Sequence, residues 1–410
     1  MATITGANGN TLTTLAAGAN DSNGVAAALS AQISAALQAG TLAVPVGGNI
    51  NINSTGLQQL TAGGTTTLLP TTGTVTIGQT GLAAVARTVI GNGNSNQRIL
   101  ADNGALTYVS NGGSGTIVTG DGSNTLFTGG TGFNIATGAG NDLIIAASGN
   151  NTINAGGGNN TIFLSNGADR VTLSGGSDVV VGTGTGNLVD TIFGGAGTAL
   201  IGENGSSNLL FVGGTGSATV FGGSGSNTVF AGAGGGLFAG GSAGNNILVG
   251  SSTGASTLFG GGSGDALYAV GTGQTVLVAG AGNETLTGAS SEVGNVFYGS
   301  ATSATQIFGG RGNDVIFAGL NSTVNGGAGA DLIAIANGRA GGAVEIFAFE
   351  AADRVTLQGF GANELSNALG PNGRGASTVV AGQSSTTIVL TGGTRIDFVG
   401  VTSLSSSNFI

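Results

Sequence analysis

The side chains able to do chemistry in this chain are carboxylates, amides and a few guanidinium groups, and in one stretch they are evenly spaced. Asp or Asn recurs at every ninth residue there: Asp142, Asn151, Asn160, Asp169, Asp178 and Asn187. The chain has no His and no Cys, and its 8 basic residues are all Arg. This set can hydrogen-bond or offer oxygen atoms, but it contains no Ser–His or Cys–His pair and no Schiff-base lysine.

The missing residue types exclude several classes of site. Without Lys there is no phosphate-binding P-loop, and without His and Cys there is no HExxH zinc site, disulfide framework or iron–sulfur cluster. The net charge of −10 and the isoelectric point of about 4.1 argue against nucleic acid and anionic membrane surfaces, which need cationic partners. No apolar run approaches the roughly 18 residues of a membrane helix. We therefore expect no nucleic-acid partner and no membrane insertion.

The elements that position these side chains follow the same period. An aliphatic residue keeps the nine-residue step: Ile144, Ile153, Ile162, Val171, Val180 and Val189. A typical unit, residues 222–230, joins a glycine cluster to the triplet Thr-Val-Phe. Glycine permits tight turns with positive φ, and β-branched and aromatic residues suit a short strand. We predict an all-β fold: a parallel β-roll or β-solenoid of nine-residue repeats over residues 111–340, with two units in each coil.

The region before the repeats, residues 1–110, lacks the nine-residue period. Apolar residues there step by four, which predicts one helix near residues 24–39: Val25, Leu29, Ile33 and Leu37. The rest of this region is typical of short strands. We expect a capping or assembly region, which either covers the first coil or docks onto a neighbouring subunit.

The region after the repeats, residues 341–410, is predicted to form a C-terminal β cap that includes a hairpin built from residues 386–390 and 394–401. Its Ser-rich end, residues 402–410, resembles an uncleaved type I secretion signal, with a polar tail as the alternative. The first residues have neither a basic segment nor the apolar segment of a Sec-type signal peptide. Export without an N-terminal signal peptide is the expectation that fits both ends.

The repeat unit resembles the RTX calcium-binding nonapeptide, Gly-Gly-x-Gly-x-Asp-x-U-x, in which U is a large aliphatic residue. Residues 309–317 and 326–334 match in full, and residues 137–145 lack only the first Gly. The resemblance covers about residues 111–410. It implies a parallel β-roll in which Asp side chains and carbonyls of stacked turns hold Ca²⁺. It also implies a secreted protein of Gram-negative bacteria, similar to surface-layer and extracellular matrix proteins exported by type I secretion.

The resemblance implies a few calcium sites at the Asp positions of the repeats: Asp314, Asp331, Asp142, Asp178 and Asp169. Units two apart share a column, so Asp142, Asn160 and Asp178 would form one column, and Asn151, Asp169 and Asn187 the facing one. Most Asp positions of the motif hold Asn, Ser or Thr here, which bring no charge to an ion. Alternatively, stacked Asn side chains can form a hydrogen-bonded ladder with no metal.

Taken together, the sequence predicts an extracellular structural protein rather than an enzyme. It would assemble with copies of itself into a surface layer, sheath or biofilm-matrix fibre, stabilised by calcium, with cell-surface or matrix polysaccharide as a further partner. A secreted adhesin or glycan-binding module is the alternative. A β-helical polysaccharide-active enzyme is less favoured, because the carboxylates are scattered and no Lys, His or Tyr cluster accompanies them.

Overall fold

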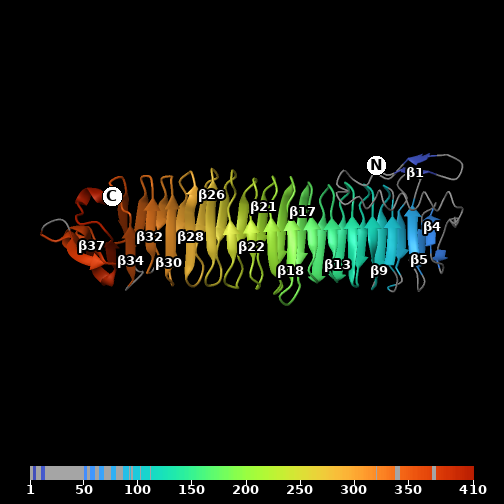
Figure 1. The fold of residues 1–410 in the computed structure, drawn as a ribbon, viewed down its shortest axis with the longest axis horizontal. Coiled ribbons are helices and arrows are strands. Elements are labelled where there is room, and N and C mark those ends of the chain that lie inside the picture. The colour runs from blue at the N-terminus through green and yellow to red at the C-terminus, as the bar shows by residue number, and fades with distance from the viewer. Residues whose placement is uncertain are drawn as a thin grey trace. The chain divides into compact units, whose positions relative to one another are not determined.

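The computed structural model describes the backbone of six short strands between residues 3 and 79, and residues 86–410 apart from 92, 94–95, 102, 111, 320, 338–341 and 372–374. The helix expected near residues 24–39 lies outside the described residues. Two compact units are present, residues 1–216 and residues 217–410. Each unit is a parallel β-solenoid, as the repeat predicts, and Figure 1 gives the order of the strands. The expected region boundaries at residues 110 and 340 stay predictions.

In unit 1 each strand pairs in parallel with the strand two places along the chain, so that even-numbered and odd-numbered strands form separate sheets. The even sheet contains β4 (Gly56–Leu60), β6 (Val75–Gln79), β8 (Asn96–Leu100), β10 (Ser114–Val118), β12 (Gly132–Ala136), β14 (Thr152–Asn154), β16 (Arg170–Thr172), β18 (Val189–Phe193) and β20 (Asn208–Val212). The odd sheet contains β3 (Ile50–Ile52), β5 (Gly64–Leu68), β7 (Arg87–Ile90), β9 (Leu106–Ser110), β11 (Thr125–Thr128), β13 (Leu143–Ser148), β15 (Thr161–Asn166), β17 (Ser177–Gly182) and β19 (Thr198–Glu203). An antiparallel pair, β1 (Thr3–Thr5) and β2 (Thr11–Thr13), precedes them.

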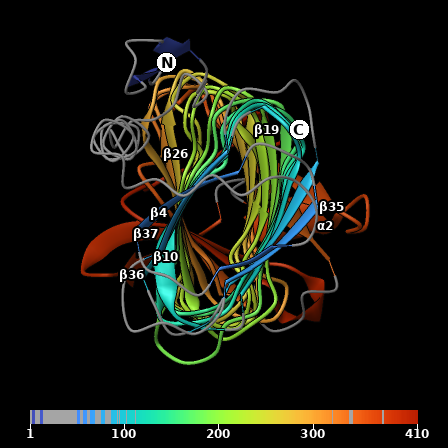
Figure 2. The ribbon, with the colours of Figure 1, turned by 90° about the vertical axis from the view of Figure 1, so that its right-hand side faces the viewer.

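Unit 2 repeats this arrangement. Its even sheet contains β22 (Thr228–Phe230), β24 (Ile247–Val249), β26 (Ala266–Gly271), β28 (Glu284–Ser291), β30 (Thr305–Gly310), β32 (Thr323–Gly327) and β34 (Ala343–Phe347). Its odd sheet contains β21 (Ala218–Phe221), β23 (Gly236–Ala239), β25 (Ser256–Phe259), β27 (Thr275–Val278), β29 (Val296–Tyr298), β31 (Val315–Phe317), β33 (Leu332–Ala336) and β35 (Arg354–Gln358). The view in Figure 2 is down the axis about which the coils wind, so that strands of successive coils within a unit overlap.

The chain ends in an antiparallel segment with one short helix, α2 (Glu364–Leu369). The last strands are β36 (Ala376–Val380), β37 (Gln383–Val389) and β38 (Arg395–Phe398). The predicted hairpin is confirmed: β37 pairs antiparallel with β38, and β38 continues the even sheet by pairing in parallel with β34. Among the described residues, no helix has the length and apolar character needed to cross a membrane.

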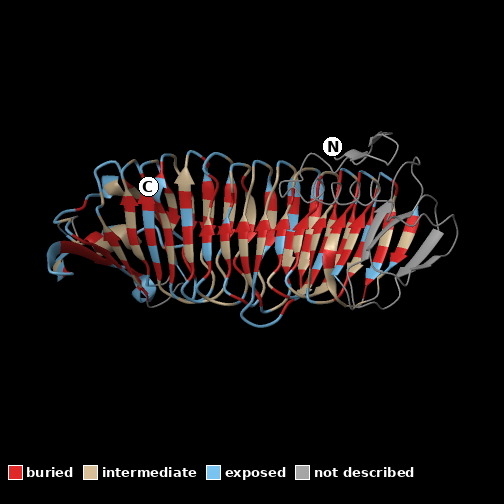
Figure 3. Cartoon of the chain, turned by 45° about the vertical axis from the view of Figure 1, so that its right-hand side comes forward, coloured by how far each residue is buried: buried red, intermediate tan, exposed pale blue. Residues whose placement is uncertain are grey.

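The core of each unit is a stack of inward-facing aliphatic and aromatic side chains, with at least one from each strand between β7 and β35. Burial alternates along the strands in period two, as Figure 3 shows, because successive side chains of a strand point to opposite faces. The predicted core positions are buried through Val180. Val189 is an exception: it is 41% exposed, and Ile192 occupies the core position instead. The cause is a longer coil, since Thr152 pairs with Arg170, 18 residues on, but Arg170 pairs with Thr191, 21 residues on.

Candidate metal centre

Buried Asp and Asn side chains precede the strands in columns that run from coil to coil. In the odd column of unit 1 the members are Asn124, Asp142, Asn160 and Asp178, all buried. The backbone N–H of each residue donates to Oδ1 of the next: Asn124 to Asp142 at 2.8 Å, Asp142 to Asn160 at 3.0 Å, and Asn160 to Asp178 at 3.0 Å. Each side chain therefore satisfies a buried amide of the preceding coil. The predicted column of Asp142, Asn160 and Asp178 is confirmed.

The Asn members of this column do more than accept a hydrogen bond. The Asn160 Nδ2 group donates to Asp178 Oδ1 at 2.9 Å and to the Gly157 carbonyl at 3.3 Å. Asn124 Nδ2 similarly donates to Asp142 Oδ1 at 2.8 Å and to the Gly122 carbonyl at 2.6 Å. These carboxylate and turn carbonyl oxygens are the kind of ligand a hard cation takes. Where Asn alternates with Asp, the Asn Nδ2 group therefore donates to oxygens that could otherwise serve as ligands of a cation.

The even column of unit 1 changes partway from Asn to Asp. Asn151 N–H donates to Asp169 Oδ1 at 2.7 Å, and Asp169 N–H donates to Asp190 Oδ1 at 2.9 Å. The prediction is correct for Asn151 and Asp169 but wrong for Asn187, which is exposed. Asp190 takes its place because the coil between them has 21 residues rather than 18. In this column an Asp stacks directly on an Asp, and Oδ2 of both Asp169 and Asp190 is buried without a hydrogen-bond partner.

The odd column of unit 2 ends in three consecutive acids. Asn295 N–H donates to Asp314 Oδ1 at 2.7 Å, Asp314 N–H to Asp331 Oδ1 at 2.9 Å, and Asp331 N–H to Asp353 Oδ1 at 3.0 Å. Asp314 and Asp331 are thus column mates, as predicted from their spacing. Asp314 Oδ2 accepts a hydrogen bond from Gly310 N–H at 2.7 Å, whereas Asp331 Oδ2 has no partner. No Asn amide separates these three carboxylates.

The even column of unit 2 contains Asn227, Asn246, Asp265 and Glu284, all buried. Asn246 donates to Asp265 Oδ1 through both its backbone N–H at 2.8 Å and Nδ2 at 3.0 Å. Glu284 Oε2 accepts a hydrogen bond from Gly280 N–H at 2.7 Å, and Oε1 is buried without a partner. The nine-residue spacing did not single out Asp190, Asp353 or Glu284 as candidates. Their signal is a position just before or at the start of a strand, not their distance from the previous acid.

The residues of these columns overlap the segments matched by a known family model. The model of the RTX calcium-binding nonapeptide repeat matches residues 134–162, 145–180, 155–189, 211–235 and 304–333. The chain carries RTX repeats. Together with the β-solenoid, they make this an RTX-like β-roll protein. RTX nonapeptide repeats are calcium-binding, and RTX repeat proteins are typically secreted. Neither the curated proteins nor the solved structures contain a match to the chain.

Burial gives the acids of the RTX-like roll high pKa values. It raises the pKa of Asp142, Asp169, Asp178 and Asp314, and hydrogen bonds from the neighbouring coil act against it. Burial, with repulsion between neighbouring acids as a lesser cause, raises the pKa of Asp190 and Asp331 to about 6 and that of Glu284 to about 7. The charged forms of these groups are therefore disfavoured unless a cation lies beside them.

These oxygens fit calcium. Among the described residues, no three His, Cys, Asp or Glu side chains lie together in a way that could hold a metal. A cation would therefore take one or two carboxylates and complete its shell with carbonyl oxygens and water, which suits the 6–8 oxygen ligands of Ca²⁺. The unpartnered buried oxygens of Asp142, Asp169 and Asp331 belong to this donor set. Calcium binding by Asp314, Asp331, Asp142, Asp178 and Asp169 individually stays a prediction.

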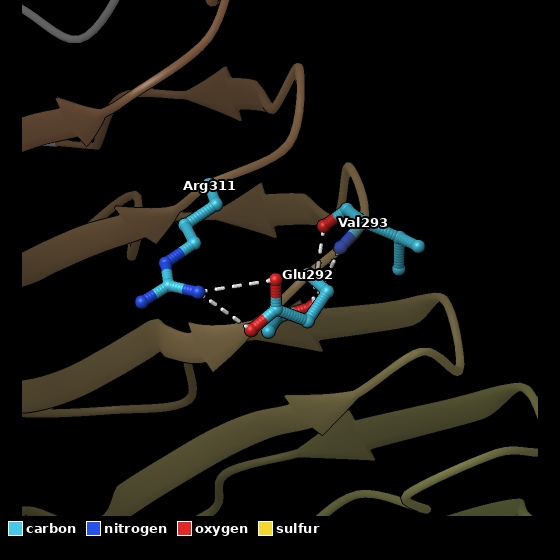
Figure 4. A network of polar contacts seen from close by, with 4 residues as sticks. Glu292, Val293 and Arg311 are labelled. Carbon is cyan, nitrogen blue, oxygen red and sulfur yellow. Dashed lines mark hydrogen bonds and ion pairs between the residues drawn. The ribbon is translucent and has the colours of Figure 1, made fainter.

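An exposed ion pair lies outside these columns. Arg311 Nη1 is 2.9 Å from Glu292 Oε1, across two consecutive coils (Figure 4), and the two side chains are 70% and 54% exposed. Exposed pairs of this kind contribute roughly 0–1 kcal/mol. Glu292 is therefore a useful control acid, since it carries charge but no ladder hydrogen bond.

Proposed function

We propose that this protein is an extracellular structural protein whose calcium-stabilised RTX-like roll associates side by side with further copies of itself. The observation that carries the proposal is a row of outward-facing aromatic side chains on each sheet of unit 2, spaced two coils apart from Phe221 to Tyr298 and from Phe230 to Phe308. The proposal extends to location outside the cell, export by type I secretion, and a role in a surface layer, sheath or biofilm matrix.

The first row lies on the odd sheet. Strand register aligns Phe221, Ala239, Phe259, Val278 and Tyr298 in successive coils. The three aromatic side chains are 47%, 37% and 39% exposed. Larger and smaller side chains therefore alternate from Phe221 to Tyr298, and the Tyr298 ring then stacks on Phe317 of the next coil, with 4.6 Å between ring centroids.

A second row on the even sheet has the same pattern. Register aligns Phe230, Val249, Tyr268, Thr287 and Phe308. Phe230 is 41% exposed, and Tyr268 and Phe308 are each 37% exposed. Two coils correspond to about 10 Å at the usual strand spacing.

This periodicity favours a second copy of the chain as the partner. Contiguous exposed apolar side chains are typical of interaction surfaces. A row that alternates large and small groups at a fixed spacing complements an identical row displaced by one coil, because each aromatic side chain then lies opposite a small one. Only 6% of the residues are charged, so little electrostatic repulsion opposes contact between copies.

The last parallel strands of unit 2, β34 and β35, have covered edges. This supports contact between copies through the faces of the sheets rather than by addition of a strand to β34 or β35. The even sheet continues from β34 through β38 and β37 to β36, so the parallel edge of β34 is covered and the antiparallel strand β36 is the outermost strand. At the odd sheet, Ile410 N–H donates to the Val355 carbonyl at 3.0 Å, beside a bridge between Val355 and Phe409. Covered edges do not template pairing with another chain.

The buried acids support a structural rather than a catalytic role. Asp142, Asp169 and Asp314 are each 1–2% exposed and bond to backbone amides of the preceding coil. A general acid or base must be within hydrogen-bonding reach of its substrate. These groups instead stabilise the stacking of coils.

The test is negative-stain electron microscopy with light scattering, on wild type and variants, in EGTA and in millimolar Ca²⁺. We expect sheets or filaments of the wild type in Ca²⁺. F221S/F259S/Y298S should keep the calcium-dependent thermal transition but lose the assemblies. The control T219S/T257S changes outward residues of the same strands and should assemble normally. Isolated wild-type particles in both conditions, or normal assembly by the triple Ser variant, would overturn the proposal.

A further inference from the structure

The family model leaves residues 190–210 of unit 1 unmatched, between the segments that end at 189 and begin at 211. Two turns stack there. The first, residues 182–189, joins β17 to β18, and the second, residues 203–207, joins β19 to β20. Backbone hydrogen bonds hold them together, from Asn204 N–H to the Gly182 carbonyl at 2.8 Å and from Ser206 N–H to the Gly184 carbonyl at 3.0 Å.

Glu203 places a buried carboxylate between these turns. It is the last residue of β19 and the register partner of Gly182, and it is 4% exposed. Its carboxylate lies against Gly182, in the space that a Cβ atom there would need. Glu203 Oε1 accepts a hydrogen bond from Gly205 N–H at 3.1 Å. The absence of a side chain at Gly182 is what gives this carboxylate room.

Two further oxygen atoms are buried and have no hydrogen-bond partner: Ser207 Oγ in the second turn, and Asp190 Oδ2 on β18, directly after the first turn. Both residues are 0% exposed. Ser207 Oγ lies beside Gly184, where the Ser165 carbonyl of the coil below also approaches. A hydroxyl and a carboxylate oxygen that are buried without a partner each lose the hydrogen bonds they would make to water, which favours a ligand between them.

No basic side chain neutralises the acids here. The two ion pairs among the described residues are Arg311–Glu292 and Arg395–Asp397, both in unit 2. Burial, and to a lesser extent repulsion from Asp190, raises the pKa of Glu203 to about 7. Burial, with repulsion from Asp169 as a lesser cause, also raises the pKa of Asp190. Among the described residues, Asp190 and Glu203 are therefore buried carboxylates with no ion-pair partner.

We propose that Asp190, Glu203 and Ser207 bind a calcium ion between these two turns. All three offer oxygen, which selects a hard cation, and two carboxylates with a hydroxyl leave room for the carbonyl and water ligands that Ca²⁺ takes. Asp190 belongs to the even column of acids, whereas Glu203 ends a strand of the odd sheet outside the columns, so this site joins a column acid to a residue that the repeat does not supply. The inference rests on the calcium-binding part of the proposed function, but not on self-assembly.

The experiment counts calcium ions on the full chain by isothermal titration calorimetry. E203Q and D190N replace each carboxylate by an amide of the same shape, and D190N keeps the Oδ1 that accepts the Asp169 N–H. E292Q is the matched control, since it removes an exposed charge. D331N probes a nonapeptide site. We expect E203Q and D190N each to bind one ion fewer than wild type, and E292Q to bind the wild-type number.

A second readout excludes a merely structural effect. Hydrogen exchange should show calcium-dependent protection of amides 182–189 and 203–207 in wild type. E203Q should lose it there while keeping calcium-dependent protection near Asp331. In EGTA, E203Q should unfold at a higher temperature than wild type, because it removes a buried charge that lacks a counter-ion.

The outcomes separate this inference from the proposed function. If E203Q and D190N bind the wild-type number of ions while D331N binds fewer, the site at Asp190 and Glu203 is wrong and calcium binding by the repeats stands. If wild type binds no calcium at all, both the site and the calcium part of the proposed function fail.

Discussion

The odd columns of the two units share one ladder of hydrogen bonds from backbone N–H groups to Oδ1 atoms, but they differ in the order of Asp and Asn. In unit 1 the order is Asn124, Asp142, Asn160 and Asp178, and the Asn amides donate to the carboxylates above them. In unit 2 the order ends in Asp314, Asp331 and Asp353, with no amide between them. The backbone-to-Oδ1 bond is common to both columns. The difference teaches that an Asn amide can pair with the carboxylate of the next coil, whereas stacked acids have no such donor between them. We therefore predict that the stacked acids depend on a cation and that the Asn-containing column does not.

Calcium removal should have the largest effect, and within the odd columns it should fall on unit 2. A ligand at 100 times its Kd stabilises the folded state by about 2.7 kcal/mol for each site. We expect EGTA to lower the unfolding temperature and to remove hydrogen-exchange protection from β31, β33 and β35, while β11, β13 and β15 stay protected. Equal loss of protection in both sets of strands would contradict the comparison.

An Asn in a column should contribute to the free energy of unfolding whether or not Ca²⁺ is present. N160A removes the acceptor of the Asp142 N–H and the amide that donates to Asp178, at 3.0 and 2.9 Å. Leaving a buried amide unpaired costs about 1–3 kcal/mol. Urea unfolding should show this loss equally in EGTA and in Ca²⁺. A loss seen only in Ca²⁺ would mean that Asn160 acts through an ion.

Replacing an Asn of one column by Asp, and an Asp of the other by Asn, should exchange the calcium dependence of their thermal stability. N160D places three acids in succession in unit 1 and should be less stable than wild type in EGTA but gain stability from Ca²⁺. D331N inserts an amide among the acids of unit 2 and should do the reverse. Thermal unfolding with and without Ca²⁺ measures both. Parallel behaviour of N160D and D331N would show that the order of Asp and Asn does not set the need for calcium.

The stability of the calcium-free protein should fall as the pH rises, because its buried acids have raised pKa values. The pKa values of Glu203 and Glu284 rise from 4.5 to about 7, and those of Asp190 and Asp331 rise from 3.8 to about 6. The folded state then binds protons more tightly than the unfolded state, so stability is greatest below about pH 4 and falls as the pH rises to about 7. E284Q should flatten this decline. Stability that increases over this range in EGTA would be the contrary result.

The smallest effect should come from the exposed ion pair. E292Q breaks the contact with Arg311 and should change the free energy of unfolding by less than about 1 kcal/mol, with no change in calcium binding. Urea unfolding in low and high salt checks this. A larger loss, or a lost ion, would place Glu292 among the calcium ligands.

The sequence predicted the coil because its signal is local. Nine-residue spacing, glycine turns and β-branched triplets are enough to predict strands stacked in parallel, and they placed Asp142 with Asp178 and Asp314 with Asp331. The nine-residue spacing predicted the wrong column residue where a turn is longer. Asn187 fits the spacing but is exposed, and Asp190 occupies the column position. A turn can absorb extra residues outside the sheet without disturbing strand register, so counting residues cannot locate the next rung.

By itself, then, the sequence determined the β-roll, its oxygen-only chemistry and the exclusion of His, Cys and Lys sites. Only the tertiary structure decided which acids stack on acids and which on amides, because that depends on residues 17–22 positions apart meeting across coils. It also decided that the carboxylate of Glu203, from the end of one strand, lies against Gly182 of the preceding coil. Such contacts arise from the register between coils, which the turns set and which no single repeat encodes.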